Sequence, residues 1–535
     1  MEKMRIAVWH NLPSGGGKRQ LYNHVKGLVE RGHYVESWCP DSADQSYLPL
    51  GELIKEHIIP LKQRSDIFNA SARPLIVVKK MIQALEENCK ACAEEINKGD
   101  FDVLFANTCK YLRTTPIAGF VNLPSALYLN EPYRWFYEAM PELPWIAPVN
   151  LFGRKPSLRS LREYFVKQAT LSGIRVQARA ELEYAKKFDL LLVNSVFSRE
   201  SILRTYNLDS KVCYLGIDTD YYKPTGEPKE NFVVGLGTIY HAKGIDRAIR
   251  ALGTIEKTKR PALVWIGNGA SEGDLKQYKA LAEELVVDFL PKIHLSDEEV
   301  ISHLSRAMVM IYTSRLEPFG YAPLEANACC TPVVGIAEGG MKETIREGIN
   351  GFLVPDDDSH FLGERIRMFV DEPELSRVMG SRGREYVKDI WKMKFSTDNI
   401  ESFLNRLVNE KKERKISVDS KSLEEIEAAS TIAMGIDDLK LKNDRLQIRG
   451  WALIDDGQNA TGSEIFVLVQ NGANAYLIST TKIKRPDVTR HFGSKGNFED
   501  TGFFADSHIV YDKKTTRIGI MIRRSGKMAL RYIQP

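Results

Sequence analysis

From Met4 to about Glu410, short apolar runs rich in β-branched residues alternate with longer segments of helical periodicity. Apolar runs of this kind are typical of parallel strands whose two faces are covered by helices. The pattern therefore predicts α/β structure throughout this part of the chain. The predicted strands are Arg5–Trp9, Val35–Cys39, Val103–Asn107, Ala126–Leu129, Leu190–Asn194, Phe232–Gly237, Ala262–Gly267, Val309–Thr313 and Pro332–Gly335.

Two changes of pattern predict domain boundaries. A charged, turn-rich stretch from Gly216 to Pro228 precedes a fresh strand and separates two α/β regions. Charged residues dominate Asn405–Ala429, and beyond Thr431 short strands alternate with turns, which predicts a small β-sandwich. We expect two Rossmann-like α/β domains facing a cleft (1–222 and 223–405), a charged linker (406–430) and an all-β sandwich (431–535).

Length, charge and cysteine content exclude several classes of protein. A chain of 535 residues is too long for one hydrophobic core. The balance of 74 basic against 70 acidic residues does not predict nucleic-acid binding. No apolar run is long enough to span a membrane, and the start of the chain does not resemble a signal peptide. Seven scattered cysteines indicate reduced thiols, so we expect a cytoplasmic protein, with Cys89 and Cys92 as ordinary helix residues.

Two carboxylates eight positions apart, Glu317 and Glu325, follow an apolar strand at a predicted loop-to-helix transition. The backbone N–H groups of Phe319, Gly320 and Tyr321 would meet a diphosphate at the helix N-terminus, while each carboxylate accepts hydrogen bonds from sugar hydroxyls. A capped helix with a surface glutamate is the alternative interpretation. The segment therefore predicts a site for a phosphorylated sugar.

The surrounding sequence strengthens this interpretation. Thr331–Ile345, with its paired Gly339-Gly340, and Glu347–Pro355 follow directly, and together they closely resemble the donor-binding half of GT-B glycosyltransferases of family 4. The resemblance spans about residues 1–405. It also includes Gly15-Gly16-Gly17, Asn194–Ser198, Gly216-Ile217-Asp218 and Lys243–Asp246.

This resemblance implies a role for individual residues. Lys243 would bind the donor diphosphate, Glu317 the transferred hexose and Glu325 the nucleotide ribose. Gly16 and Gly17 would let the backbone approach donor phosphate or acceptor closely, although a plain glycine turn is the alternative. Many relatives carry an arginine five positions before the lysine, and here that position is Thr238. Lys18 and Arg19 are expected to add charge at the cleft mouth.

A second segment bears on the acceptor and the donor. Asn130-Glu131-Pro132-Tyr133-Arg134 resembles the His-x-Pro-x-Arg segment of many family 4 mannosyltransferases, with Asn130 at the histidine position. Asn130, Glu131 and Arg134 are candidate acceptor or sugar contacts, or Glu131 merely caps a turn. The resemblance implies GDP-mannose as donor, with UDP-glucose or UDP-GlcNAc as alternatives.

Nothing in the sequence predicts a metal site. No DxD motif ends a strand, and Asp356-Asp357-Asp358 is expected to be a solvated acidic turn. The resemblance implies transfer with retention of configuration, by front-face displacement assisted by the leaving phosphate. No metal or other cofactor is expected, and Lys243 with backbone amides would meet the phosphate charge.

A basic segment and the sandwich have open roles. The basic residues of 151–187 would lie on an anionic membrane face beside a lipid-linked acceptor, or form a solvated helix face. They are Arg154, Lys155, Arg159, Arg162, Lys167, Arg175, Arg179, Lys186 and Lys187. The sandwich resembles one appended to some bacterial polysaccharide glycosyltransferases, where Trp451 would stack on a sugar or fill the core.

Three functional hypotheses follow. The first is hexosyl transfer from a nucleotide-diphosphate sugar to a glycan or glycolipid in surface-polysaccharide or lipopolysaccharide assembly. The second is a sugar-nucleotide epimerase of the same fold, and the third is a binding protein without catalysis. Lys243, Glu317 and Glu325 favour the first, because an epimerase would need its own catalytic carboxylates and histidine.

Overall fold

The computed structural model divides the chain into two compact units. They are Met1–Val121 with Ser125–Leu404, and Asn122–Pro124 with Asn405–Pro535. The structure describes residues 3–62, 75–137, 158–355, 358–413, 415–418, 423, 426, 431–442, 445–456, 460, 462–471, 474–492, 498–509, 511–512, 515–524 and 527–533.

The first unit contains two α/β lobes, and the first lobe is built on a seven-stranded parallel sheet ordered β3-β2-β1-β4-β5-β6-β7. Its strands are β1 (Arg5–Asn11), β2 (Tyr34–Pro40), β3 (Lys55–Ile59), β4 (Val103–Cys109), β5 (Ser125–Tyr128), β6 (Leu190–Val193) and β7 (Lys211–Val212). Its helices are α1 (Gly16–Glu30), η1 (Leu50–Glu52), α3 (Leu75–Lys98), η2 (Pro116–Gly119), α4 (Arg134–Tyr137), α5 (Leu158–Ala185) and α6 (Val196–Tyr206). Strands β3 and β7 were not predicted from the sequence; they lie at the two edges of the sheet and carry charged residues.

The second lobe repeats this design with a six-stranded parallel sheet ordered β10-β9-β8-β11-β12-β13. Its strands are β8 (Glu230–Leu236), β9 (Ala262–Gly267), β10 (Phe289–Ile293), β11 (Ala307–Tyr312), β12 (Val333–Ile336) and β13 (Gly351–Val354). Its helices are η3 (His241–Lys243), α7 (Ile245–Gly253), α8 (Glu272–Glu284), α9 (Asp297–Arg306), α10 (Tyr321–Ala328), α11 (Met341–Thr344), α12 (Ser359–Asp371) and α13 (Pro373–Ile390). Completely buried side chains such as Val309 and Ile311 make the middle of this sheet its core.

Both sheets follow the doubly wound order, in which the chain reverses direction beside the first strand of each lobe. Ligands of such sheets bind outside the carboxyl ends of the strands, at this reversal point. Here the reversal lies between β1 and β4 in one lobe and between β8 and β11 in the other. The loops after these strands are therefore the expected place for a site.

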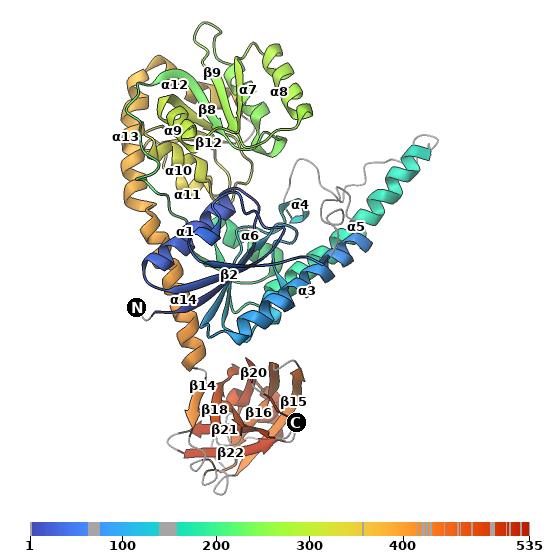
Figure 1. Ribbon diagram of the computed structural model, residues 1–535. Helices are drawn as coiled ribbons and strands as arrows, with labels where there is room; N and C mark the ends of the chain where they lie inside the picture. Colours follow the sequence, from blue (N-terminus) through green and yellow to red (C-terminus); the bar gives the residue numbers. More distant parts are fainter. Residues whose placement is uncertain are drawn as a thin grey trace. The chain divides into compact units, whose positions relative to one another are not determined.

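The last helix of the unit returns to the first lobe. Figure 1 shows α13 along the second lobe and α14 (Met393–Glu413) along the first. His24 Nε2 lies 2.9 Å from Ser396 Oγ, and Arg31 donates to Glu401 at 2.6 Å. At Gly27 a Cβ would lie 2.4 Å from Thr397 Oγ1, so only glycine allows this close approach. The contact ties α14 to α1.

The second unit contains the predicted β-sandwich, which has a five-stranded sheet (β14-β18-β17-β21-β22) and a four-stranded sheet (β15-β16-β20-β19), both antiparallel. The elements are β14 (Lys415–Val418), β15 (Ile432–Lys442), β16 (Arg445–Ile454), β17 (Glu464–Asn471), β18 (Asn474–Ser479), β19 (Thr481–Ile483), α16 (Pro486–Phe492), η4 (Glu499–Thr501), β20 (Gly502–His508), β21 (Thr516–Arg524) and β22 (Lys527–Ile533). The final turns of α14 and strand β14 occupy part of 406–430, where a charged linker was expected.

Trp451 lies beside a small apolar cluster of the sandwich rather than on an open platform. Its ring contacts Phe492 edge-on at 5.7 Å, and both pack against Val488 and Phe498. This placement favours the core interpretation of Trp451. The fold expected from the sequence, two parallel-sheet α/β domains and an all-β sandwich, is confirmed. Among the described residues, no helix has the length and apolar character needed to cross a bilayer.

Candidate functional site

A cavity of about 830 Å³ lies between the two lobes of the first unit. Its walls come from the loops after β1, β4 and β5 of the first lobe and after β8 and β11 of the second, which is where the sheet topology places a site. This volume is within the usual range for a small-molecule site. Every sequence-predicted site residue lines it: Gly16, Gly17, Asn130, Glu131, Arg134, Thr238, Lys243, Glu317, Phe319, Gly320, Tyr321 and Glu325.

Two glycines position Lys243. After β8 the chain turns at Gly237, whose φ of 144° lies outside the range that other residues adopt easily. At Gly244, which has a φ of 70°, a Cβ would lie 2.3 Å from the carbonyl oxygen of Thr313. Lys243 is therefore held directly beside the end of β11, and any larger residue at Gly244 would push it away.

Lys243 and Glu317 form an ion pair in the cavity, with 2.9 Å between Nζ and Oε2. Their side chains are 22% and 17% exposed, so a ligand can reach them. Burial disfavours the charge on Lys243, but the Glu317 carboxylate outweighs it and raises the lysine pKa. Burial likewise opposes ionisation of Glu317, yet Lys243 and then Arg134 hold the pKa of that carboxyl at about 2. Both groups are charged over the whole physiological range.

The donors to Glu317 all reach the same oxygen. Lys243 Nζ, the Tyr312 hydroxyl and the Ser314 hydroxyl each donate to Oε2 at 2.9 Å. Among the described residues no hydrogen bond reaches Oε1. One carboxylate oxygen is thus fixed by the protein, and the other is available to a hydroxyl of a ligand.

The paired glycines of the motif hold the Glu317 loop in place. Gly340 N–H donates to Glu317 O at 2.8 Å. A Cβ at Gly339 would lie 2.4 Å from the same oxygen, and a Cβ at Gly340 would lie 2.5 Å from Pro318 O. Because the two backbones touch, side chains at these positions would displace the loop.

The start of α10 faces the glycine turn of the first lobe. Gly320, with a φ of 100°, precedes the helix without a side-chain cap, and the first helical residues Tyr321 and Ala322 line the cavity with it. The N–H groups of this first turn have no partner within the helix. Pro323 contributes no N–H. At Gly16 a Cβ would lie 3.6 Å from the Tyr321 ring, so the turn and the helix start come close together. The Phe319 ring is buried against Trp391 at 5.4 Å.

The candidate acceptor contacts form a polar group on the first-lobe side. Glu131 lies between two arginines, 3.4 Å from Arg113 and 3.6 Å from Arg134. Asn130 accepts a hydrogen bond from Asn194 at 3.2 Å. Arg134 crosses to the second lobe, where its Nη2 donates to the carbonyl of Arg315 at 2.6 Å. Arg134 thus reaches the loop that carries Glu317.

Thr238 donates to Asn268 at 2.6 Å, and among the described cavity residues no arginine comes from the same strand end.

Two other cavity residues lay outside the motifs. Tyr47 and Arg113 also line the cavity, but each comes from a loop without a recognisable pattern, so nothing in the sequence identified them. Lys18 was expected at the cleft mouth; instead its side chain is completely buried, because the first turn of α1 directs it toward the sheet.

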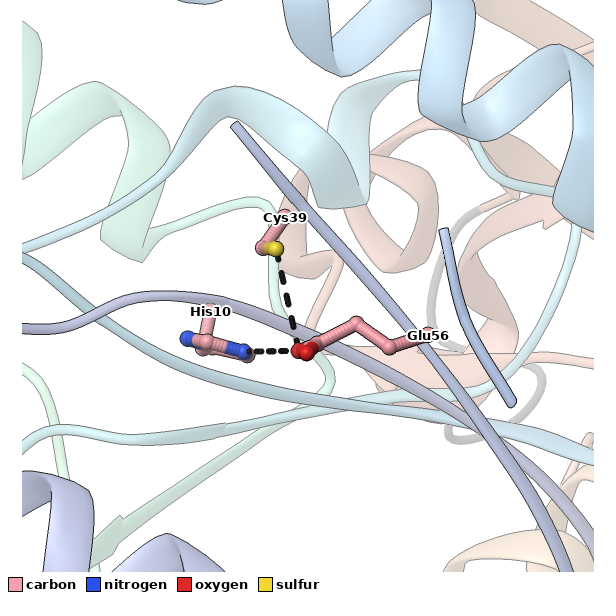
Figure 2. Close-up of side chains that lie close together, drawn as sticks. All are labelled: His10, Cys39 and Glu56. Carbon is pink, nitrogen blue, oxygen red and sulfur yellow. Dashed lines mark hydrogen bonds and ion pairs between the residues drawn. The ribbon is translucent and has the colours of Figure 1, made fainter. Parts of the chain in front are cut away.

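Lys18 lies near a buried polar cluster behind the glycine turn. Figure 2 shows His10, Cys39 and Glu56, whose potential metal-ligand atoms lie within 4.8 Å of one another. His10 Nε2 is 2.9 Å from Glu56 Oε1, and the Cys39 thiol is 3.7 Å from the same oxygen. The Lys18 ammonium interacts electrostatically with Glu56, and His10 Nδ1 has no partner among the described groups. The Lys18 ammonium would repel a divalent metal here, and His10 Nδ1 lacks the hydrogen-bond partner that usually orients a metal-bound imidazole. Both observations disfavour a divalent metal at this cluster.

Other expectations fall partly outside the described residues. Asp358 caps α12 through Phe361 N–H at 2.9 Å, whereas Asp356 and Asp357 lie outside them. Arg154 and Lys155 of the basic segment also lie outside. Arg175 and Arg179 are exposed within α5, and Lys186 is exposed directly after it, while Lys187 interacts with the rings of Phe120 and Tyr184.

Comparison with known families and proteins gives a match at the second lobe. Residues 219–386 match the family model described as "Glycosyl transferases group 1". An uncharacterized glycosyltransferase of Methanocaldococcus jannaschii is 29% identical over 33% of this chain and 48% of its own length. N-acetyl-alpha-D-glucosaminyl L-malate synthase of Bacillus anthracis is 24% identical over 76% of this chain and 97% of its own. Human alpha-1,3/1,6-mannosyltransferase ALG2 is 34% identical over 26% of this chain and 30% of its own.

Solved structures share the two-lobed architecture. Sucrose-phosphate synthase of Thermosynechococcus elongatus has a TM-score of 0.58 at 16% identity, covering 76% of this chain and all of that one. The Anabaena protein HepE, in complex with UDP and glucose, has a TM-score of 0.53 at 19% identity, covering 75% of this chain and all of that one. At these identities the likeness shows the fold, which is the GT-B fold.

Proposed function

We propose that this chain, a GT-B protein whose residues 219–386 match the group 1 glycosyl transferases, transfers a hexose from a nucleotide-diphosphate sugar to a glycan or glycolipid. The observation that carries the proposal is the Lys243–Glu317 pair, in a cavity that is also lined by the glycine turn and the start of α10. These groups suit the two ends of such a donor. A cation and helix N–H groups bind the diphosphate, while a carboxylate accepts from the sugar hydroxyls.

The chemistry follows from charge development at the leaving phosphate. When the bond between the anomeric carbon and the β-phosphate oxygen breaks, negative charge grows on that oxygen. Lys243 and the N–H groups at Tyr321 and Ala322 then interact more strongly with the transition state than with the bound donor, which lowers the barrier. Glu317, fixed through Oε2, would hold the hexose with Oε1. We propose retention of configuration by front-face attack of the acceptor.

Arg134 is our candidate for the second phosphate cation, in place of the arginine that the resemblance places at Thr238. Its charge lowers the pKa of Glu317, and its guanidinium contacts the Arg315 carbonyl beside the Glu317 loop. It therefore lies close to Lys243 although it comes from the other lobe. This proposal replaces the sugar-contact role expected for Arg134.

The proposal requires no metal ion. Glu131, Glu317 and Glu325 line the described cavity, and each already pairs with an arginine or lysine of the protein. Asp297, which also lines it, accepts a hydrogen bond from the Tyr221 hydroxyl at 3.0 Å. A divalent ion bridging donor phosphates needs carboxylates free for coordination. We therefore expect activity to persist after removal of divalent cations with a chelator.

GDP-mannose is the donor we propose first. The His-x-Pro-x-Arg-like segment at 130–134 supports it, as does the local similarity to a protein named as a mannosyltransferase. UDP-GlcNAc is the second candidate, because the relative matched over most of its length is named N-acetyl-alpha-D-glucosaminyl L-malate synthase. The acceptor is proposed to belong to surface-polysaccharide or lipopolysaccharide assembly, with α5 and the residues after it as the face toward a membrane.

The test is donor binding and slow donor hydrolysis by the full chain, with and without a chelator. GDP-mannose, UDP-glucose, UDP-galactose and UDP-GlcNAc form the panel. Lys243→Ala and Glu317→Ala should each lower kcat/KM for the preferred donor substrate by about 10²- to 10³-fold, as losing one transition-state contact does in other enzymes.

Lys259→Ala is the matched control, because Lys259 forms a 2.8 Å pair with Asp371 that is exposed and away from the cavity. It should leave kcat/KM unchanged. If none of the four donors binds, the transferase proposal is wrong. Tight binding without hydrolysis or transfer to any acceptor would favour the binding-protein hypothesis instead.

A further inference from the structure

A second ion pair at the cavity joins the two lobes. Arg19, in the first turn of α1, donates through Nη1 to Oε1 of Glu325 on α10. The side chains are only 23% and 5% exposed. No other element separates them, so Glu325 of one lobe is held by a residue of the other.

The surroundings of Arg19 fix its position. Its Nε donates to the Tyr47 hydroxyl at 2.9 Å, and its guanidinium lies 5.6 Å from the Tyr222 ring centroid. Burial disfavours its charge, but Glu325, Tyr222 and Tyr47 together outweigh this effect and raise its pKa. Arg19, Tyr47, Tyr222 and Glu325 all line the cavity. These four residues therefore form an ordered, charged wall of the cavity, and the Arg19–Glu325 pair is not a contact between two exposed side chains.

The geometry of α10 places this wall beside the expected diphosphate. Glu325 follows Tyr321 by four residues, which puts it on the same face of the helix, about 6 Å further along the axis. A nucleotide with its phosphates at the helix start thus brings its ribose toward Glu325. An ionised carboxylate has about four acceptor positions. Arg19 occupies Oε1, which leaves positions on Oε2 for the two ribose hydroxyls.

We infer that Arg19 is a positioning residue for the donor ribose: it orients the Glu325 carboxylate, so that recognition of the ribose hydroxyls by the second lobe depends on the first lobe. The inference rests on the proposed function, because it assumes that a nucleotide binds at α10. Arg19 need not touch the ligand. Its effect is transmitted through the single carboxylate that it holds.

The experiment is calorimetric titration of the full chain with GDP and UDP and with their 2′,3′-dideoxy analogues. Arg19→Gln should weaken binding of the preferred ribonucleotide by about tenfold or more, the cost of one charge-assisted hydrogen bond. Binding of the dideoxy analogue should stay the same, because it has no hydroxyls for Glu325. Arg19→Lys keeps the charge but loses the forked geometry of the guanidinium. Its affinity for the preferred ribonucleotide should therefore lie between those of the unchanged protein and Arg19→Gln.

The control is Arg31→Gln, because Arg31 directly follows α1 and pairs with Glu401 and Asp398 outside the cavity. It should change neither affinity, and unfolding temperatures of all variants exclude a general loss of structure. Equal weakening for both nucleotides, or none for either, would overturn the role of Arg19. If Lys243→Ala abolishes binding in the same assay, the proposed function stands even then; if the unchanged protein binds no nucleotide, both fail.

Discussion

At the scale of single residues, substitutions of Arg134 and Thr238 test which residue supplies the second phosphate cation. If Arg134 supplies the second phosphate cation, Arg134→Ala should lower kcat/KM by about 10²- to 10³-fold, as loss of one transition-state donor does. An added Thr238→Arg change, at the position where the resemblance expects an arginine, should restore much of the loss. Steady-state kinetics with the preferred donor would show this. No recovery in the double variant, despite native stability, would argue against a phosphate role for Arg134.

The structure brings the site residues expected from the sequence to one cavity. Glu317, Gly320 and Glu325 lie within one continuous segment at a strand end and a helix start, whereas Lys243 was selected through the family resemblance. The partners of these residues were not predictable in this way. Arg113 and Tyr47 come from loops whose sequences carry no pattern, and only folding brings them to the cavity.

At the scale of elements, the buried face of α1 carries a pH-sensitive group. Burial lowers the pKa of His24 to about 4, against 6.5 when unfolded. The unfolded chain therefore binds a proton between these values and the folded chain does not. This stability is fully present above pH 6.5 and lost as the pH falls toward 4, by up to about 3 kcal/mol.

His24→Gln keeps a partner for Ser396 but cannot titrate. Urea unfolding at pH 7.5 and pH 4.5 should show a smaller loss of stability on acidification in this variant than in the unchanged protein. An equal loss would place the acid sensitivity elsewhere, for example at His10, whose pKa is also lowered by burial.

The loop before α10 depends on its contact with Gly340. Gly340→Ala would place a Cβ 2.5 Å from Pro318 O, so we expect a cost of about 1–3 kcal/mol and weaker donor binding as the Glu317 loop shifts. Gly273→Ala in α8 is the matched control, because its nearest neighbour would be 3.8 Å away. Thermal unfolding and nucleotide titration check both. Unchanged binding by Gly340→Ala would show that the loop tolerates the displacement.

At the scale of the whole molecule, the described cavity belongs entirely to the first compact unit. A chain ending at Glu413 keeps α14 and its contacts with α1. We expect it to bind the donor nucleotide with unchanged affinity, measured by titration, since none of the cavity residues comes from the sandwich. A clear loss of affinity would mean that the sandwich supports the donor site directly.

The sequence by itself determined the alternation of strands and helices and the two α/β lobes followed by a sandwich, and its resemblance to a family selected the candidate donor residues. Periodicity encodes the first two features, since it depends on which neighbours a residue has along the chain. Tertiary structure alone decided that Arg134 reaches the Glu317 loop, that Arg19 holds Glu325, and that Lys18 is buried rather than at the cleft. Each of these contacts joins residues far apart in sequence. They form because the two doubly wound sheets bring their carboxyl edges, and hence their loops, to one cavity.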